Sequence, residues 1–209
     1  MTLNENRYKR QLLDELQDPF VMFPFESVAQ TINKALENSG ELLADRMGPY
    51  GVARKFWDVP TELIHTEIGL LIGTAFVLGQ IVISQTVGIF LNLRELTDYP
   101  HALPTGKHDI LKLEAEVNTG SEFSEIQIID SVANYFKHYH EWPSDWIISN
   151  TTGSQRRTIE IVKSIGMATN NDFTENLHCA LRHLKIDLPD ILPMAEKIMS
   201  WREKLACLL

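Results

Sequence analysis

Residues Ile68 to Leu93 read IGLLIGTAFVLGQIVISQTVGIFLNL, a run of 26 residues without Asp, Glu, Lys, Arg or His. The run is far longer than a β-strand, and no proline divides it. We therefore predict one long apolar helix over about residues 61–96, around which the rest of the chain is organised.

Such a helix is either the buried centre of a helical domain or a membrane span. A span needs about 20 apolar residues, and the run is long enough. However, basic residues lie on both sides of it, Arg54 and Lys55 before and Arg94 after, so little charge asymmetry would orient it. Six polar residues also interrupt it: Thr74, Gln80, Ser84, Gln85, Thr86 and Asn92. These features favour a buried core helix, and a single span is the alternative if other helices leave it uncovered.

Four polar residues, Glu67, Thr74, Gln85 and Asn92, fall near one stripe of this helix because their spacings approximate whole turns. The stripe is either a narrow edge that reaches solvent or a buried polar network that faces another helix. We favour the solvent-exposed edge.

Three glycines of the long helix, Gly69, Gly73 and Gly79, weaken a helix by up to about 1 kcal/mol each relative to alanine. Small residues let another helix approach closely, so we expect tight packing at these positions.

The amino-acid composition is typical of a globular protein. The 209 residues are 44% hydrophobic and 22% charged, which is enough for one core and one helical domain over residues 1–209. A net charge of −9 disfavours a broad basic surface for DNA or RNA, although a local basic patch remains compatible with it.

Cys179 and Cys207 form no Cys-x-x-Cys motif, and the polar N-terminus does not resemble a secretory leader. We expect a cytoplasmic protein without a disulfide.

Helical periodicity recurs along most of the remaining chain, which predicts an all-α bundle of six to eight helices. The first helix is expected over about 4–17, and a further helix from Phe25 has a potential break at Asn38–Gly40. Residues 97–121 are predicted to be an irregular linker. Capping boxes, Ser124 with Gln127 and Asp172 with Glu175, should open two later helices, and Pro193 suits the first turn of the last one.

Two apolar segments suggest association with a protein partner or a second copy of the chain. The segment Phe20–Phe25 is aromatic, follows Pro19 and contains Pro24, and is expected to form an irregular strap. The second is the C-terminal tail, Leu205–Leu209. Ordinary packing within one chain is the alternative explanation for both.

The densest polar cluster is the stretch from Asn134 to Trp142. Asn134, His138 and Glu141 stand at i, i+4 and i+7 with Lys137 beside them, so one helical face carries an amide, an imidazole, a carboxylate and an ammonium group. Such a histidine suits general acid–base chemistry near neutral pH, and Asn134 and Glu141 suit ligand binding. The alternative is a solvated helix face that Asp130 continues.

Several familiar sites are not expected. The sequence Thr105-Gly106-Lys107 lacks the preceding glycine of a phosphate-binding loop, and His108 stands where Ser or Thr is needed. His138 and His140 would point in nearly opposite directions on a helix, so they do not converge on one ion. We predict neither a metal site nor a cofactor.

The all-α pattern, the glycine-containing apolar helix and the sequence ANYFKHYHEW resemble small bacterial helical proteins near the HEPN superfamily. The resemblance implies a helical bundle, commonly dimeric, which in active members is a metal-independent ribonuclease with an Arg, four to six residues, and then a His. Arg94 and His101 have six residues between them and match this spacing. RNA cleavage through the 2′-hydroxyl needs a general base and a cation, which His101 or His138 with Arg94 or Lys137 could supply.

Two functions therefore remain open at this stage. The first is a soluble, cytoplasmic helical bundle, a homo-oligomer or partner-binding protein, that acts through protein or small-ligand contacts. The second is a HEPN-like ribonuclease of a toxin or defence system, with RNA as its substrate. The sequence does not decide whether the protein is an enzyme.

Overall fold

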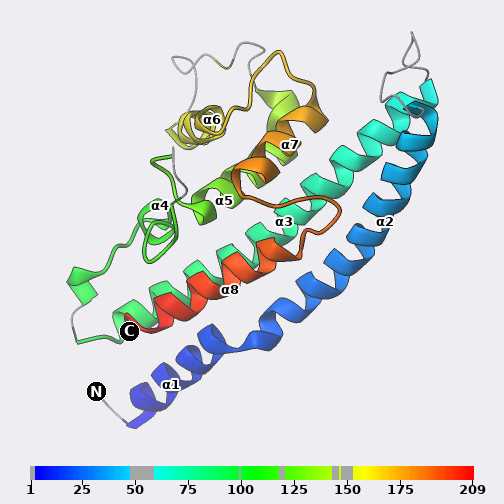
Figure 1. The fold of residues 1–209 in the computed structure, drawn as a ribbon. Coiled ribbons are helices and arrows are strands. Elements are labelled where there is room, and N and C mark those ends of the chain that lie inside the picture. The colour runs from blue at the N-terminus through cyan, green and yellow to red at the C-terminus, as the bar shows by residue number, and fades with distance from the viewer. Residues whose placement is uncertain (1–2, 48–58, 99, 118–120, 143–145, 147–152) are drawn as a thin grey trace.

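The computed structural model describes residues 3–47, 59–98, 100–117, 121–142, 146 and 153–209, and these residues form an all-α bundle (Figure 1). The predicted long central helix is present as α3 (Val59–Glu95). Within the described ranges no strand occurs, and Val117 and Ser124 make one isolated bridge. The other helices are α1 (Leu3–Gln17), α2 (Phe23–Met47), α4 (Lys107–Ile110), α5 (Glu125–His138), α6 (Gly153–Ser164), α7 (Phe173–His183) and α8 (Leu192–Ala206).

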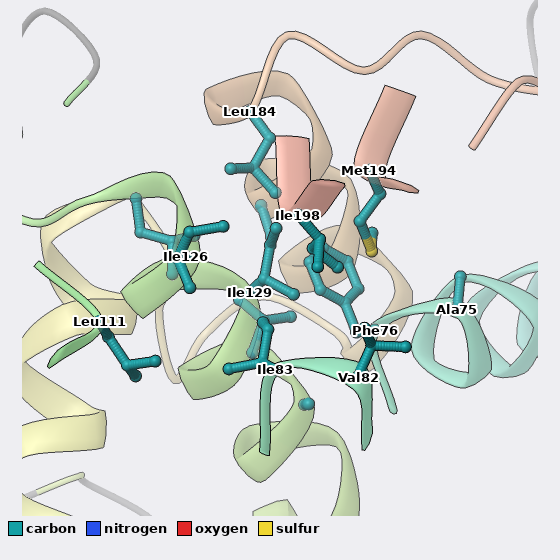
Figure 2. Close-up of a cluster of buried hydrophobic side chains, with 14 of the residues drawn as sticks. Ala75, Phe76, Val82, Ile83, Leu111, Ile126, Ile129, Leu184, Met194 and Ile198 are labelled. Atoms are coloured by element: carbon teal, nitrogen blue, oxygen red, sulfur yellow. The ribbon is translucent and has the colours of Figure 1, made fainter. Parts of the chain in front are cut away.

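Helix α3 packs against α1, α2, α5, α7 and α8, which confirms its predicted central place (Figure 1). Its side chains Ile72, Phe76, Ile83 and Phe90 are completely buried. By length and composition the helix could also cross a membrane, and 56% of its most apolar window is buried within this chain. Figure 2 shows how side chains from α3, α5 and α8 interlock in the centre of the bundle.

The glycines of α3 mark places where other helices come close, as expected. A Cβ atom on Gly73 would lie 1.9 Å from the Phe136 ring of α5, and one on Gly69 would lie 2.3 Å from Thr174 Oγ1 of α7. Close approach at these two positions therefore depends on the absence of a side chain.

The polar stripe of α3 is a solvent-exposed edge, as favoured from the sequence, because Glu67, Thr74, Gln85 and Asn92 are all exposed. The buried polar side chains of this helix lie elsewhere, at Gln80 and Thr86.

A buried arginine joins three helices. Arg202 of α8 is fully buried and donates to Thr86 Oγ1 of α3 and, over 2.9 Å, to the backbone oxygen of Glu15 of α1. Burial lowers the pKa of this guanidinium from its ordinary value. Because a buried cation needs polar partners, these bonds fix α8 against α1 and α3.

Three expectations about local structure need correction. Helix α2 runs through residues 38–40 without a break, since Ser39 is buried against neighbouring helices. The strap is helical: Pro19–Met22 forms a 3₁₀ turn and α2 begins at Phe23. The linker contains a second 3₁₀ turn, Pro100–Ala102, as well as α4.

The predicted helix starts are confirmed where the structure describes them. Ser124 and Asp172 each form a complete capping box, with Gln127 and Glu175 respectively, and Pro193 lies in the first turn of α8. The sequence Gly48-Pro49-Tyr50-Gly51 also predicts a turn after α2, and these residues lie outside those that the structure describes.

A glycine substitution tests the contact between α3 and α5. We expect Gly73→Ala to lower the free energy of unfolding by about 1–2 kcal/mol, because overpacking against Phe136 outweighs the gain in helix propensity. Gly40→Ala on α2 is the matched control, since a Cβ there meets nothing within 4 Å and should be neutral or stabilising. Urea unfolding measures both variants, and equal effects would contradict the packing argument.

Candidate site in the groove between helices α5 and α6

Helix α5 places polar side chains in the interior of the molecule. Its apolar side, which includes Ile129 and Val132, packs on α3, and its other side faces α6. Asp130 was predicted to continue a solvated face, and this is wrong: it is 8% exposed because α3 and α4 cover it.

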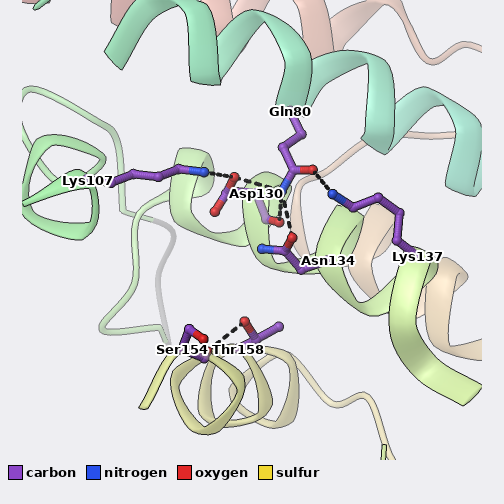
Figure 3. A network of polar contacts seen from close by, with 7 residues as sticks. All are labelled: Gln80, Lys107, Asp130, Asn134, Lys137, Ser154 and Thr158. Atoms are coloured by element: carbon purple, nitrogen blue, oxygen red, sulfur yellow. Dashed lines mark hydrogen bonds and ion pairs between the residues drawn. The ribbon is translucent and has the colours of Figure 1, made fainter. Parts of the chain in front are cut away.

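The buried amide of Gln80 on α3 organises these polar side chains (Figure 3). Its Nε2 lies 2.9 Å from Asp130 Oδ1, 3.0 Å from the Asp130 backbone oxygen and 3.0 Å from Asn134 Oδ1. Its Oε1 accepts a hydrogen bond of 2.6 Å from Lys137 Nζ. Both ends of the amide are therefore satisfied, as a buried polar group requires.

A second lysine closes the other end of this network. Lys107 Nζ, at the start of α4, lies 2.7 Å from Asp130 Oδ1. The Asp130 side chain is 12% exposed and that of Lys107 is 43% exposed, so a buried carboxylate is paired with a cation at the surface. The network thus ties the short α4 to α5 and α3.

Two adjacent cavities, of about 280 and 430 Å³, lie between α5 and α6. They share three lining residues, Asn134, Ser154 and Thr158, so they form one groove (Figure 3). The α4 end adds mainly Lys107, His108, Gln127, Asp130 and Arg157, and the other end adds Gln155, His138, Glu141 and Trp142.

At the α4 end the groove holds a neutral histidine beside an arginine. Burial lowers the pKa of His108 from its ordinary value, and the nearby charges of Arg157 and Lys112 lower it further. The amide nitrogen of Gln127 lies 3.0 Å from His108 Nδ1, which holds the ring in place. A neutral imidazole can accept a proton near pH 7.

At the opposite end the structure brings together three of the predicted residues. Asn134, His138 and Glu141 line the same cavity, and His138 Nδ1 lies 3.2 Å from Glu141 Oε2. The side chains of His138 and Glu141 are 50% and 60% exposed. Lys137 is directed instead toward Gln80 and stabilises the buried network.

The other predicted pair, Arg94 and His101, lies outside this groove. Arg94 is largely buried, donates to the backbone oxygen of Leu103 over 3.0 Å and pairs with Glu95, whereas His101 is exposed. Arg94 follows Gln80 by 14 residues of α3, which is about 21 Å along the helix. Gly73, which lies in the other direction from Gln80, faces Phe136 near the end of α5, so Arg94 and His138 lie far apart along α3.

Sequence reasoning missed Lys107, His108 and Arg157 as a group. Lys107 and His108 stood out only as a failed phosphate-loop match, and Arg157 comes from a helix 50 residues later. The described residues contain no group of three His, Cys, Asp or Glu side chains arranged to hold a metal ion.

No protein-family model, curated protein or solved structure matches this chain. The function must therefore be argued from the groove itself.

Removing the Asp130 carboxylate should destabilise the fold. Asp130→Ala leaves the Gln80 amide short of an acceptor and Lys107 without its partner, so we expect a loss of about 1–3 kcal/mol in the free energy of unfolding. Asp187→Ala, at an exposed position, is the control and should change stability by less than about 0.5 kcal/mol. Chemical denaturation followed by circular dichroism measures both.

Acid should weaken the fold through its partly buried histidines. Burial lowers the pKa of His108, His178 and His183 below the ordinary 6.5, so the unfolded chain binds protons first as the pH falls. Their contribution to stability is complete above about pH 6.5 and is lost progressively below it, toward the lowered folded values. Urea titrations between pH 7.5 and 5 should show this loss, and His178→Gln should reduce its slope. An unchanged slope would contradict the assignment for His178.

Proposed function

We propose that the α5–α6 groove binds a small polar ligand that carries an anionic group. The observation that carries this proposal is the grouping of Lys107 and Arg157 at one end of a groove whose middle is lined by the neutral polar side chains of Asn134, Ser154 and Thr158. Lys107 is partly neutralised by Asp130, whereas Arg157 is exposed and has no ion-pair partner within the described part of the chain. A guanidinium group suits bidentate recognition of a phosphate or carboxylate.

The middle of the groove supplies groups that can orient such a ligand. The Oδ1 of Asn134 is occupied by Gln80, so its Nδ2 remains as a donor at the groove wall (Figure 3). Thr158 Oγ1 donates to the Ser154 backbone oxygen over 3.1 Å, which leaves its lone pairs to accept. Pockets for small ligands are typically about 300–1,000 Å³, and the two adjacent cavities are of this size.

The charge of the whole chain favours a small ligand over a long polyanion. With a net charge of −9, the protein repels an extended phosphate backbone except at local basic positions. A ligand with one or two anionic groups needs only the local pair, Lys107 and Arg157.

Metal-independent RNA cleavage is the second candidate, and the neutral His108 beside Arg157 is the observation that favours it. His108 would take the proton of a 2′-hydroxyl at the ring nitrogen that now accepts from Gln127, after that hydrogen bond is released, and Arg157 would stabilise the charge that develops on the phosphate. In this candidate the general base and the cation are His108 and Arg157, and not Arg94, His101 or His138 as expected from the sequence.

Matched arginine variants test ligand binding. Calorimetric titration with inorganic phosphate and with adenosine monophosphate should detect binding to wild type, and Arg157→Ala should weaken it about 10–100-fold, because a charge-assisted hydrogen bond contributes about 1.5–3 kcal/mol. Arg156→Ala is the control: it is the adjacent residue of α6, pairs with Glu160 over 3.0 Å and does not line the groove. Absence of binding by both probes, or equal loss in both variants, would contradict the proposal.

A cleavage assay separates the second candidate from the first. If the groove cleaves RNA, purified wild type should degrade a single-stranded oligoribonucleotide in the presence of EDTA, and His108→Asn should lower the rate at least 100-fold. His101→Ala and His138→Ala should retain activity. If either of these variants loses activity while His108→Asn keeps full activity, the general base is His101 or His138, as expected from the sequence, and not His108.

A further inference from the structure

The outer face of α3 carries a regular stripe on the surface of the molecule. Eight exposed or half-buried positions recur at alternating spacings of four and three residues, and Glu67 is the single charged one. Leu63, Leu70 and Ile81 are 64%, 51% and 50% exposed. This spacing is that of a helix that packs along a second helix. The stripe comprises Leu63, Glu67, Leu70, Thr74, Val77, Ile81, Ser84 and Gly88.

Helix α2 widens this surface. It lies beside α3 (Figure 1) and carries Val28, Ala35 and Leu42 at spacings of seven residues. Val28 and Leu42 are 41% and 55% exposed. Asn33, on the opposite edge of α2, bonds to Asp190 and to the Ile191 amide just before α8, which fixes that polar edge toward α8. The apolar edge of α2 therefore lies on the same side as the α3 stripe. We call this combined surface the α2–α3 face.

We propose that the α2–α3 face is the interface of a homodimer, in which α3 of one copy lies antiparallel to α3 of the other. A two-fold axis that passes α3 between Ala75 and Phe76 brings each stripe residue of one copy opposite a stripe residue of the other copy. It places Leu63 opposite Gly88 of the other copy, and Leu70 opposite Ile81. A Cβ on Gly88 would meet nothing within 4 Å in its own chain, which leaves room for a partner side chain.

Charge and area both fit a second copy. In this register Glu67 lies opposite Ser84 of the other copy, and the two Glu67 carboxylates are about 25 Å apart along the axis, so like charges do not meet. The stripe spans 26 residues, or about 39 Å. With α2 included, the face is roughly two helix diameters wide, on the order of 750 Å² per chain, close to the ~800 Å² per partner of a stable interface.

This surface differs from those expected from the sequence. Of the Phe20–Phe25 segment, Met22 and Phe25 are buried, and the tail residue Leu205 is buried as well. Phe20 remains 77% exposed on the 3₁₀ turn, where it lines a surface pocket together with Gly88 at one end of the stripe. The dimer is also independent of the α5–α6 groove, so it does not rest on the ligand proposed there.

The oligomeric state tests the proposal. Light scattering of purified wild type should give twice the 23.9 kDa chain mass, and Leu70→Glu and Gly88→Arg should each shift it to one chain mass with unchanged circular dichroism. Gly88→Arg has open space in its own chain, so the folded protomer tolerates it. Val117→Glu, an exposed apolar position in the segment before α5 and off the α2–α3 face, is the control and should remain dimeric.

Cross-linking tests the register. In a background with Cys179 and Cys207 replaced by serine, chains carrying L70C and chains carrying I81C should form a disulfide when mixed, whereas L70C alone should not, because its two copies lie about 16 Å apart along the axis. A wild-type protein of one chain mass at 50 μM would overturn the proposal. So would loss of the dimer in Val117→Glu alone, or flotation of wild type with phosphatidylcholine vesicles in place of dimer formation.

Discussion

The buried amide of Gln80 is the constraint on which the arrangement of α3, α5 and α4 depends. It sits within the charge-free run from Ile68 to Leu93, where an unpaired polar group would cost several kcal/mol. Its partners come from one neighbouring helix, α5, and they leave little freedom in how the two helices slide past each other. Because Asn134 and Asp130 are held by this amide, their remaining polar atoms define the wall of the groove. One interior interaction therefore sets both the helix register and the shape of the candidate site.

The sides of α3 are specialised in different ways. Gly69 and Gly73 allow α7 and α5 to approach closely, and Thr86 accepts a hydrogen bond from the buried Arg202 of α8. The residues of the outer stripe are exposed or half-buried in the part of the chain that the structure describes. Buried polar contacts contribute little net stability compared with apolar packing, but breaking one of them is costly. They therefore select one arrangement among the many that an apolar helix would otherwise permit.

Much of the fold follows from local sequence patterns. The long helix, the two capping boxes and the all-α class depend on periodicity and on side chains within a few residues of one another, which act in the same way in any helical protein. The break expected in α2 failed because packing around Ser39 outweighs the weak helix propensity of a Ser-Gly pair. Asp130 was misplaced for a related reason: its spacing indicates which helix face it occupies, but not whether another helix covers that face.

The sequence by itself determined the central helix, the helix boundaries near caps and prolines, and the set of polar residues on α5. Tertiary structure alone decided which of those residues meet. Lys107, Asp130 and Arg157 come from three separate helices, α4, α5 and α6, and no periodicity relates positions on different helices. Helical patterns report on neighbours within one or two turns, whereas a groove forms from the packing of separate helices, whose relative placement depends on the fit of their buried side chains.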